Sequence, residues 1–235
     1  MTRLLVTIEP DEDSLSLIEG YARLAAELHR DLVTLLLDDA GLEQAMALPF
    51  SRLQPLRAAG HAEVGPSTAR HALRVFRRRM ESRLGEVCRR LEVRWQLVES
   101  AKPPEPAAGD IVAFGPRARH RAGASAPACP VVLMRRTGRV LAVIYEGTPE
   151  TLTLAAAVAR RERLPVAVLA KADDAASAAK FAIEAAAAFG NQSVAMPAGD
   201  AELLRRLAEL RPRAVVVDAC NASVRLDAVV AALGG

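Results

Sequence analysis

Short apolar runs recur along this chain of 235 residues and restrict the folds open to it. Residues 111–114 and 131–134 are each four apolar residues long, a length typical of buried strands. Residues 4–8 and 32–37 are similar runs, and residues 15–29 between them carry apolar side chains at helical spacing. A strand, a helix and a strand in succession predict parallel pairing through a right-handed crossover. With 51% hydrophobic and only 3% aromatic residues, we expect an α/β fold with an open parallel sheet and a core of Ala, Val and Leu.

The pattern of the first half returns in the second. Residues 139–144 match residues 3–8, and similar strand and helix patterns follow in the same order. We interpret this as an internal duplication. It predicts two tandem domains, at residues 1–137 and 138–235, of which the second is shorter and lacks a final strand.

Glycines and cations follow the strand predicted at residues 111–114. In an open α/β sheet, the loop at the carboxyl end of a strand is where ligands bind. This loop offers glycine amides, a hydroxyl group and guanidinium groups to a phosphate, through Gly115, Arg117, Gly123 and Ser125. The alternative interpretation is a solvated connection in which the glycines only permit turns.

Two segments beside this loop carry a family resemblance. Residues 110–115 (Asp-Ile-Val-Ala-Phe-Gly) and 128–133 (Ala-Cys-Pro-Val-Val-Leu) resemble two strands of the universal stress proteins. The resemblance implies the adenine nucleotide alpha hydrolase-like fold in each domain. ATP-binding members of the family carry Gly-x-x-Gly, a spacer, and Gly-Ser or Gly-Thr. Here Ala118 stands at the second glycine, the spacer is too short, and the final pair is Ala124-Ser125.

The resemblance leaves two hypotheses about ligands. The first is a stress-response or regulatory protein that binds a partner and no cofactor, because the nucleotide motif is degenerate. The second is a binder of ATP or AMP that uses the loop from Gly115 to Ser125. In that case Glu9 would stand where the family has the Asp on the adenine side of the nucleotide. Asp218 follows the strand predicted at residues 214–217, where it would repel phosphate, so the second domain is predicted to be a poor nucleotide site.

Arginines gather on one long predicted helix over residues 68–91. Its apolar stripe at i, i+3 and i+4 spacing predicts that one face packs on the sheet. Between Arg70 and Arg90 the other face carries eight arginines. Such a face can bind an acidic protein, a nucleic acid or an anionic membrane surface, or can simply be solvated. No aromatic platform accompanies these arginines and the net charge is only +3, which argues against nucleic acid. We favour the solvated face, with an acidic protein partner of the Arg70–Arg90 helix as the alternative.

Motifs for catalysis and metal binding are missing from the sequence. The four histidines have no metal-ligand spacing, and no nucleophile motif occurs, so we expect neither an enzyme nor a metal site. Three scattered cysteines indicate free thiols in a reducing cytoplasm. No apolar stretch is long enough for a transmembrane helix.

The strand at residues 130–134 also bears on assembly. We expect it to be shared inside the chain or to pair two chains, and we favour a homodimer. Prolines at 103, 104 and 106 exclude a helix over residues 100–109, which should leave one face of the sheet partly bare.

Overall fold

The structure of the protein is a computed structural model. It describes residues 2–10, 12–37, 66–100, 105–107, 109–115, 130–135, 137–172, 174–190, 194–197, 199–218 and 225–233. Arg117, Gly123, Ser125, the connection over residues 40–65 and two of the three cysteines therefore lie outside the described residues.

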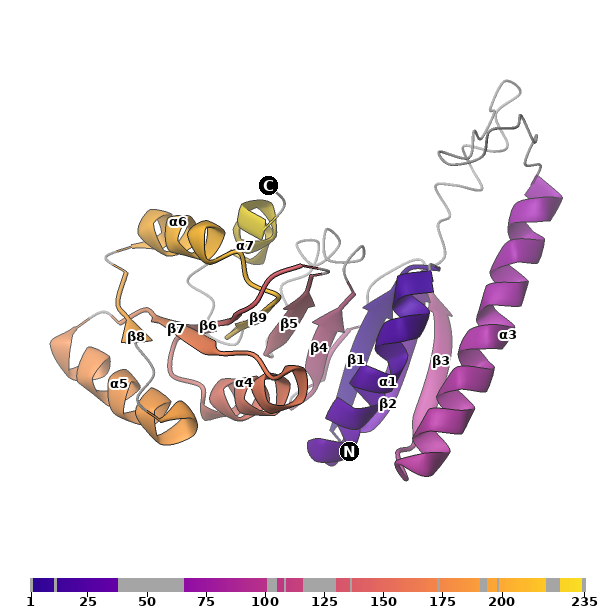
Figure 1. The fold of residues 1–235 in the computed structure, drawn as a ribbon, viewed down its shortest axis with the longest axis horizontal. Coiled ribbons are helices and arrows are strands. Elements are labelled where there is room, and N and C mark those ends of the chain that lie inside the picture. Colours follow the sequence, from indigo (N-terminus) through magenta and orange to yellow (C-terminus); the bar gives the residue numbers. More distant parts are fainter. Residues whose placement is uncertain are drawn as a thin grey trace, which may run out of the picture.

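Helices and strands alternate at both ends of the described chain, and in its middle four strands follow one another without a described helix between them (Figure 1). In the first half they are β1 (Arg3–Ile8), α1 (Glu12–Glu27), β2 (Asp31–Leu37), α3 (Pro66–Arg90), β3 (Trp95–Ser100), β4 (Ile111–Phe114) and β5 (Val131–Met134). In the second half they are β6 (Leu141–Tyr145), α4 (Pro149–Glu162), β7 (Val166–Ala170), α5 (Ala175–Phe189), β8 (Val194–Ala195), α6 (Asp200–Leu210), β9 (Ala214–Val217) and α7 (Leu226–Leu233).

All the described strands belong to one nine-stranded sheet in the order β3-β2-β1-β4-β5-β9-β6-β7-β8. Every neighbouring pair is parallel except β5 and β9, which pair antiparallel with Val132 opposite Val216. The predicted α/β class with parallel strands is confirmed. The strands of the first half of the chain end at β5 and those of the second half begin at β9. The β5–β9 pair therefore joins the two expected sheets into one continuous sheet.

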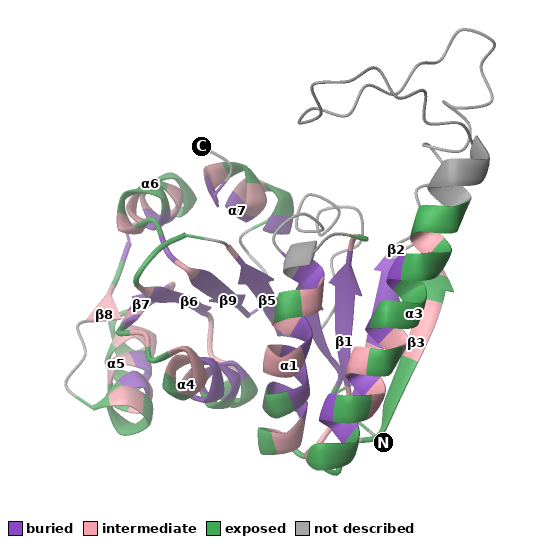
Figure 2. Ribbon diagram, turned by 45° about the vertical axis from the view of Figure 1, so that its right-hand side comes forward, coloured by how far each residue is buried: buried purple, intermediate pink, exposed green. Residues whose placement is uncertain are grey.

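Apolar side chains from the two faces of the sheet form two clusters. On one face, α1, α3, α4 and α5 pack on the strands through residues such as Tyr21, Met80 and Leu154. On the other face, α6 and α7 do so through residues such as Leu203 and Val229. Figure 2 shows the central strands as buried throughout, whereas the helices are buried only along one side. The apolar sequence runs without charged residues thus form the central strands, which helices cover on both faces of the sheet.

The closing strand β5 is shared inside the chain, which was one of the two alternatives drawn from the sequence. It lies between β4 and β9, and all four of its residues are buried. A dimer cannot form through this strand, because both of its edges are already paired. Helices α1 and α4 meet beside the β5–β9 pair, where Arg160 of α4 donates to Glu27 of α1.

The face expected to be partly bare is covered at its central residues, whereas Val33 of β2, toward the β3 edge, is only partly buried. Leu5, Val112 and Phe114 lie on the face that the proline segment should have uncovered, yet each is at most 2% exposed. They pack in the same cluster as Leu226 and Val229 of α7. The second half of the chain therefore contributes to covering this face.

Candidate functional site

The carboxyl ends of β1 and β4 bring together two residues of the predicted nucleotide site. These strands are neighbours, and β1 connects to β2 on its other side, so a topological switch point lies between them. The register pairs Thr7 with Phe114, which places Glu9 and Gly115 at the same edge of the sheet. The remaining predicted residues, Arg117, Gly123 and Ser125, lie outside the described part of the chain.

Gly115 itself offers little to a phosphate. Its backbone N–H donates to the carbonyl oxygen of Thr7 at 3.0 Å, so this amide is already used by the sheet. A Cβ at this position would lie 3.6 Å from that oxygen and 3.7 Å from a side-chain carbon of Ile8, which are ordinary contacts. The described geometry therefore does not require a glycine here.

A second switch point lies between β6 and β9, and a carboxylate fills it. Asp218 directly follows β9 and is fully buried. Its Oδ2 accepts hydrogen bonds from the backbone N–H of Thr148 at 2.9 Å and of Glu146 at 3.4 Å, in the loop that enters α4. Amides before a helix are where an anion binds, and here they already donate to a side-chain oxygen of the chain itself. The loop is tight, since Gly147 has φ +109° and a Cβ there would lie 3.2 Å from the ring of Phe181.

The arginine helix α3 packs as its sequence predicts. Phe76, Met80, Leu84 and Val87 are buried against the sheet, and the arginines described on the helix lie away from this stripe. Several are paired. Arg77 contacts Glu81 and Glu99, whereas Arg83 contacts Glu19 and Glu86.

Three arginines of α3 carry charge that the described residues do not balance. Arg74, Arg78 and Arg89 are exposed, and none forms an ion pair within the described part of the chain. Their spacing along α3 places them on its outward side, opposite the buried stripe.

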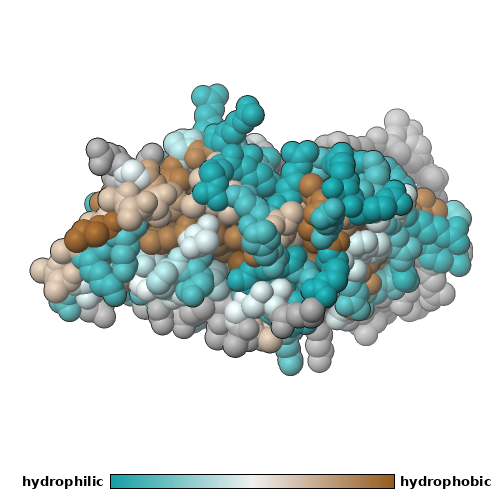
Figure 3. Space-filling view, turned by 90° about the horizontal axis from the view of Figure 1, so that it is seen from below, coloured by the Kyte–Doolittle hydropathy of each residue, from teal (hydrophilic) through white to brown (hydrophobic). Residues whose placement is uncertain are grey.

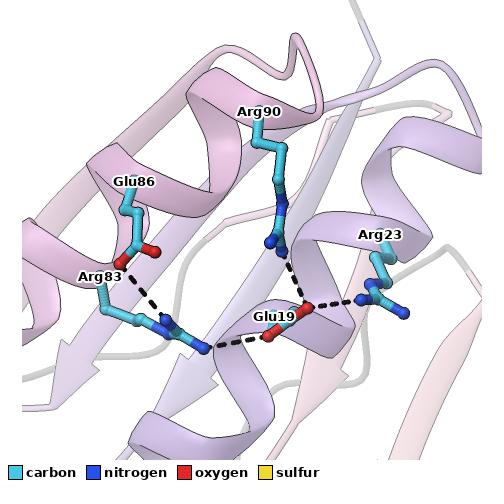
Figure 4. Close-up of polar contacts among 5 residues, drawn as sticks. All are labelled: Glu19, Arg23, Arg83, Glu86 and Arg90. Atoms are coloured by element: carbon cyan, nitrogen blue, oxygen red, sulfur yellow. Dashed lines mark hydrogen bonds and ion pairs between the residues drawn. The ribbon is translucent and has the colours of Figure 1, made fainter.

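Glu19 links helix α1 to the arginine-rich helix α3 (Figure 4). Its carboxylate accepts hydrogen bonds from Arg23 at 2.5 Å, from Arg83 at 3.0 Å and from Arg90 at 2.9 Å. The hydrogen bond from Arg23, aided by the charges of Arg23 and Arg90, outweighs burial and holds the pKa of Glu19 below its usual value. Glu19 is thus ionised at neutral pH and neutralises part of the arginine cluster.

A groove of about 660 Å³ runs between the start of α1 and the middle of α3. Three guanidinium groups, two hydroxyl groups and one carboxylate line it, from Arg78, Arg79, Arg83, Ser16, Ser82 and Glu86. Arg83 reaches both this groove and Glu19, so the groove is continuous with the contacts of Figure 4. We call this site the α1–α3 groove.

The described residues offer few candidates for a catalytic or metal-binding site. Among the described residues, no group of three or more His, Cys, Asp or Glu side chains could hold a metal ion. Burial raises the pKa of the Cys88 thiol to about 11, so this cysteine stays protonated at neutral pH. Within the same residues, none of the helices has the length and apolar character needed to cross a membrane.

The sequence missed the contacts that organise the arginine cluster. The pair of Glu19 and Arg23 could have been found, because their i, i+4 spacing is a recognised helix pattern. The contacts of Glu19 with Arg83 and Arg90 cross 64 and 71 residues of sequence, and no spacing rule reveals them. Likewise, Asp218 showed no partner in the sequence, because its partners are backbone amides.

Among known proteins, a solved structure is similar to this chain. No protein-family model matches the chain, and no curated protein matches it. The chain is similar to the crystal structure of a universal stress protein from Archaeoglobus fulgidus, with 12% sequence identity and a TM-score of 0.45. The similarity covers 92% of this chain and 95% of that one. At this level it carries no argument about ligand or activity.

Proposed function

We propose that the chain is a stress-response or regulatory protein of the universal-stress-protein type, which acts in the cytoplasm by binding an acidic partner and not by catalysis. The resemblance of residues 110–115 and 128–133 to that family supports the family assignment. The carboxylate of Asp218 at the second switch point and the engaged amide of Gly115 at the first favour binding without a nucleotide cofactor.

The observation that carries the proposed partner is the charge on α3. Arg74, Arg78 and Arg89 are exposed without ion pairs to the described residues, next to a groove lined by further arginines. Figure 3 shows the surface on the side of α3 as mainly hydrophilic, whereas apolar atoms gather toward the opposite end, where α5 carries the exposed Ile183. Electrostatic complementarity of this kind steers an acidic partner and gives specificity.

The test is binding of a fluorescent oligoglutamate peptide, followed by anisotropy at increasing salt. We expect saturable binding that weakens with salt and is lost when Arg74, Arg78 and Arg89 all become Gln. A matched control removes three cations elsewhere, through Lys180→Gln, Arg205→Gln and Arg225→Gln. Equal loss in both triple variants would refute an α3 site. Tighter binding to duplex DNA than to the peptide would refute an acidic protein partner.

A second candidate function is binding of ATP or AMP at the first switch point. It is favoured by one observation, that Glu9 and Gly115 lie together at the carboxyl edge of β1 and β4. A ligand at about 100 times its dissociation constant adds about 2.7 kcal/mol to the free energy of unfolding, which a thermal shift assay detects. We expect no shift with ATP or AMP. A shift with either, removed by Gly115→Val, would support this second candidate instead.

A further inference from the structure

We propose that the α1–α3 groove is a phosphate site, and that it anchors the acidic partner through a phosphorylated serine or threonine. The inference deepens the proposed function and rests on it. It names the site at which the partner is held and the group that is recognised there.

Guanidinium groups converge on the groove from one stretch of α3. Arg78 and Arg79 are adjacent in sequence, Arg83 follows one helical turn after Arg79, and all three line the groove. Guanidinium groups form paired hydrogen bonds with phosphate oxygens and are the usual means of recognising phosphorylated side chains. Arg78 has no ion pair with the described residues, so its charge is available.

Hydroxyl groups complete the donor set. Ser82 lies on α3 between Arg79 and Arg83, and Ser16 lies across the groove on α1. A phosphate monoester presents three strong acceptor oxygens, one more than a carboxylate, and can accept from guanidinium and hydroxyl groups together. The donors of this groove therefore match a phosphate better than a single carboxylate.

Glu19 already engages Arg83, one of the arginines that line the groove. Its two oxygens already accept from Arg23, Arg83 and Arg90 (Figure 4). Arg83 is shared between Glu19 and the groove, so Glu19 competes with any anion that enters. Removing the charge of Glu19 should strengthen binding of an external anion, whereas removing arginines should weaken it.

The groove also has a suitable size. Its volume is about 660 Å³ and it is open to solvent along α3. This leaves room for a phosphorylated side chain and the residues on either side of it. Leu15 at the edge of the groove offers apolar contact to those neighbours.

The experiment compares three synthetic acidic peptides that differ at one central position, which is phosphoserine, serine or glutamate. Anisotropy is measured with the wild-type chain and with variants. We expect the phosphoserine peptide to bind about tenfold more tightly than the serine peptide, with glutamate in between. Inorganic phosphate and free phosphoserine should compete only at far higher concentrations, because they lack the acidic flanks.

Three variants locate the site. Arg78→Ala with Arg79→Ala should abolish the preference for phosphoserine, and Glu19→Gln should strengthen binding of that peptide severalfold. Arg89→Ala is the matched control, because this exposed arginine of α3 does not line the groove and should leave the preference unchanged. Circular dichroism of each variant checks that the helices remain folded.

The outcomes separate the two proposals. Equal affinity for the phosphoserine and serine peptides would overturn the phosphate site and leave the acidic-partner proposal intact. No binding of any acidic peptide would overturn both. A phosphoserine preference that survives the loss of Arg78 and Arg79, or that Arg89→Ala removes equally, would also overturn the site proposed here.

Discussion

Asp110 offers a sharp test of how the start of β4 is held to β1. The carboxylate is only 1% exposed and accepts the backbone N–H of Arg3 and of Ala107, each at 2.9 Å. The guanidinium of Arg3 adds a salt bridge at 2.5 Å. In Asp110→Ala, two backbone donors lose their acceptor, at about 1 kcal/mol each. The Arg3 side chain is 38% exposed, so we discount its salt bridge to about 1 kcal/mol. The expected loss in the free energy of unfolding is about 3 kcal/mol.

Urea denaturation followed by circular dichroism measures this loss, and its pH dependence checks the cause. Burial alone would raise the pKa of Asp110, but hydrogen bonds from Arg3 and the Ala107 amide outweigh it and leave the pKa below its usual value. A depressed pKa contributes stability above the unfolded value of about 4, and this contribution is lost as the pH falls through the folded value. The gap between wild type and Asp110→Ala should therefore shrink below about pH 4. A loss under about 1 kcal/mol at neutral pH, or a gap that does not change with pH, would refute the argument.

Three further predictions concern the second half and assembly. Asp218→Ala should cost about 2–4 kcal/mol in urea denaturation because two amides lose their acceptor, whereas Asp218→Asn, which keeps an oxygen there, should cost much less. Gly138→Ala should cost about 2 kcal/mol or more, since φ is +123° and the new Cβ would lie 2.4 Å from the backbone nitrogen of Arg213; a stable variant would contradict this. The homodimer of the 25.1 kDa chain stays a prediction for light scattering, and Val132→Lys should unfold the protein instead of releasing folded monomers, because Val132 is fully buried between β4 and β9.

Element positions followed well from local sequence. The strands expected at residues 111–114 and 131–134 appear with those bounds. A short run of apolar residues is typical of a strand that is buried on both faces of a sheet. Helix α1 was expected over residues 15–29 but spans Glu12–Glu27. Acidic residues favour an earlier start, and His29 ends the helix in a left-handed conformation with φ +52°.

Long-range arrangement did not follow from the sequence. β5 and β9 are both valine-rich and carry no feature that selects one neighbour or one direction, so their antiparallel pairing could not be predicted. The site shows the same limit. The arginines of α3 were evident, but their apportionment between Glu19, Glu99 and solvent depends on how α1 and β3 pack beside the helix. The expected pair of domains and their duplication stay predictions.

The antiparallel pairing of β5 with β9 has a consequence for behaviour on dilution. Two separate chains that joined through such strands would part once their concentration fell below the dissociation constant. Here both strands belong to one polypeptide, so the effective concentration of each for the other is set by the connecting chain. Among the described strands, only β3 and the two-residue β8 are left as edges of the sheet. The two halves of the sheet therefore stay joined however scarce the protein becomes.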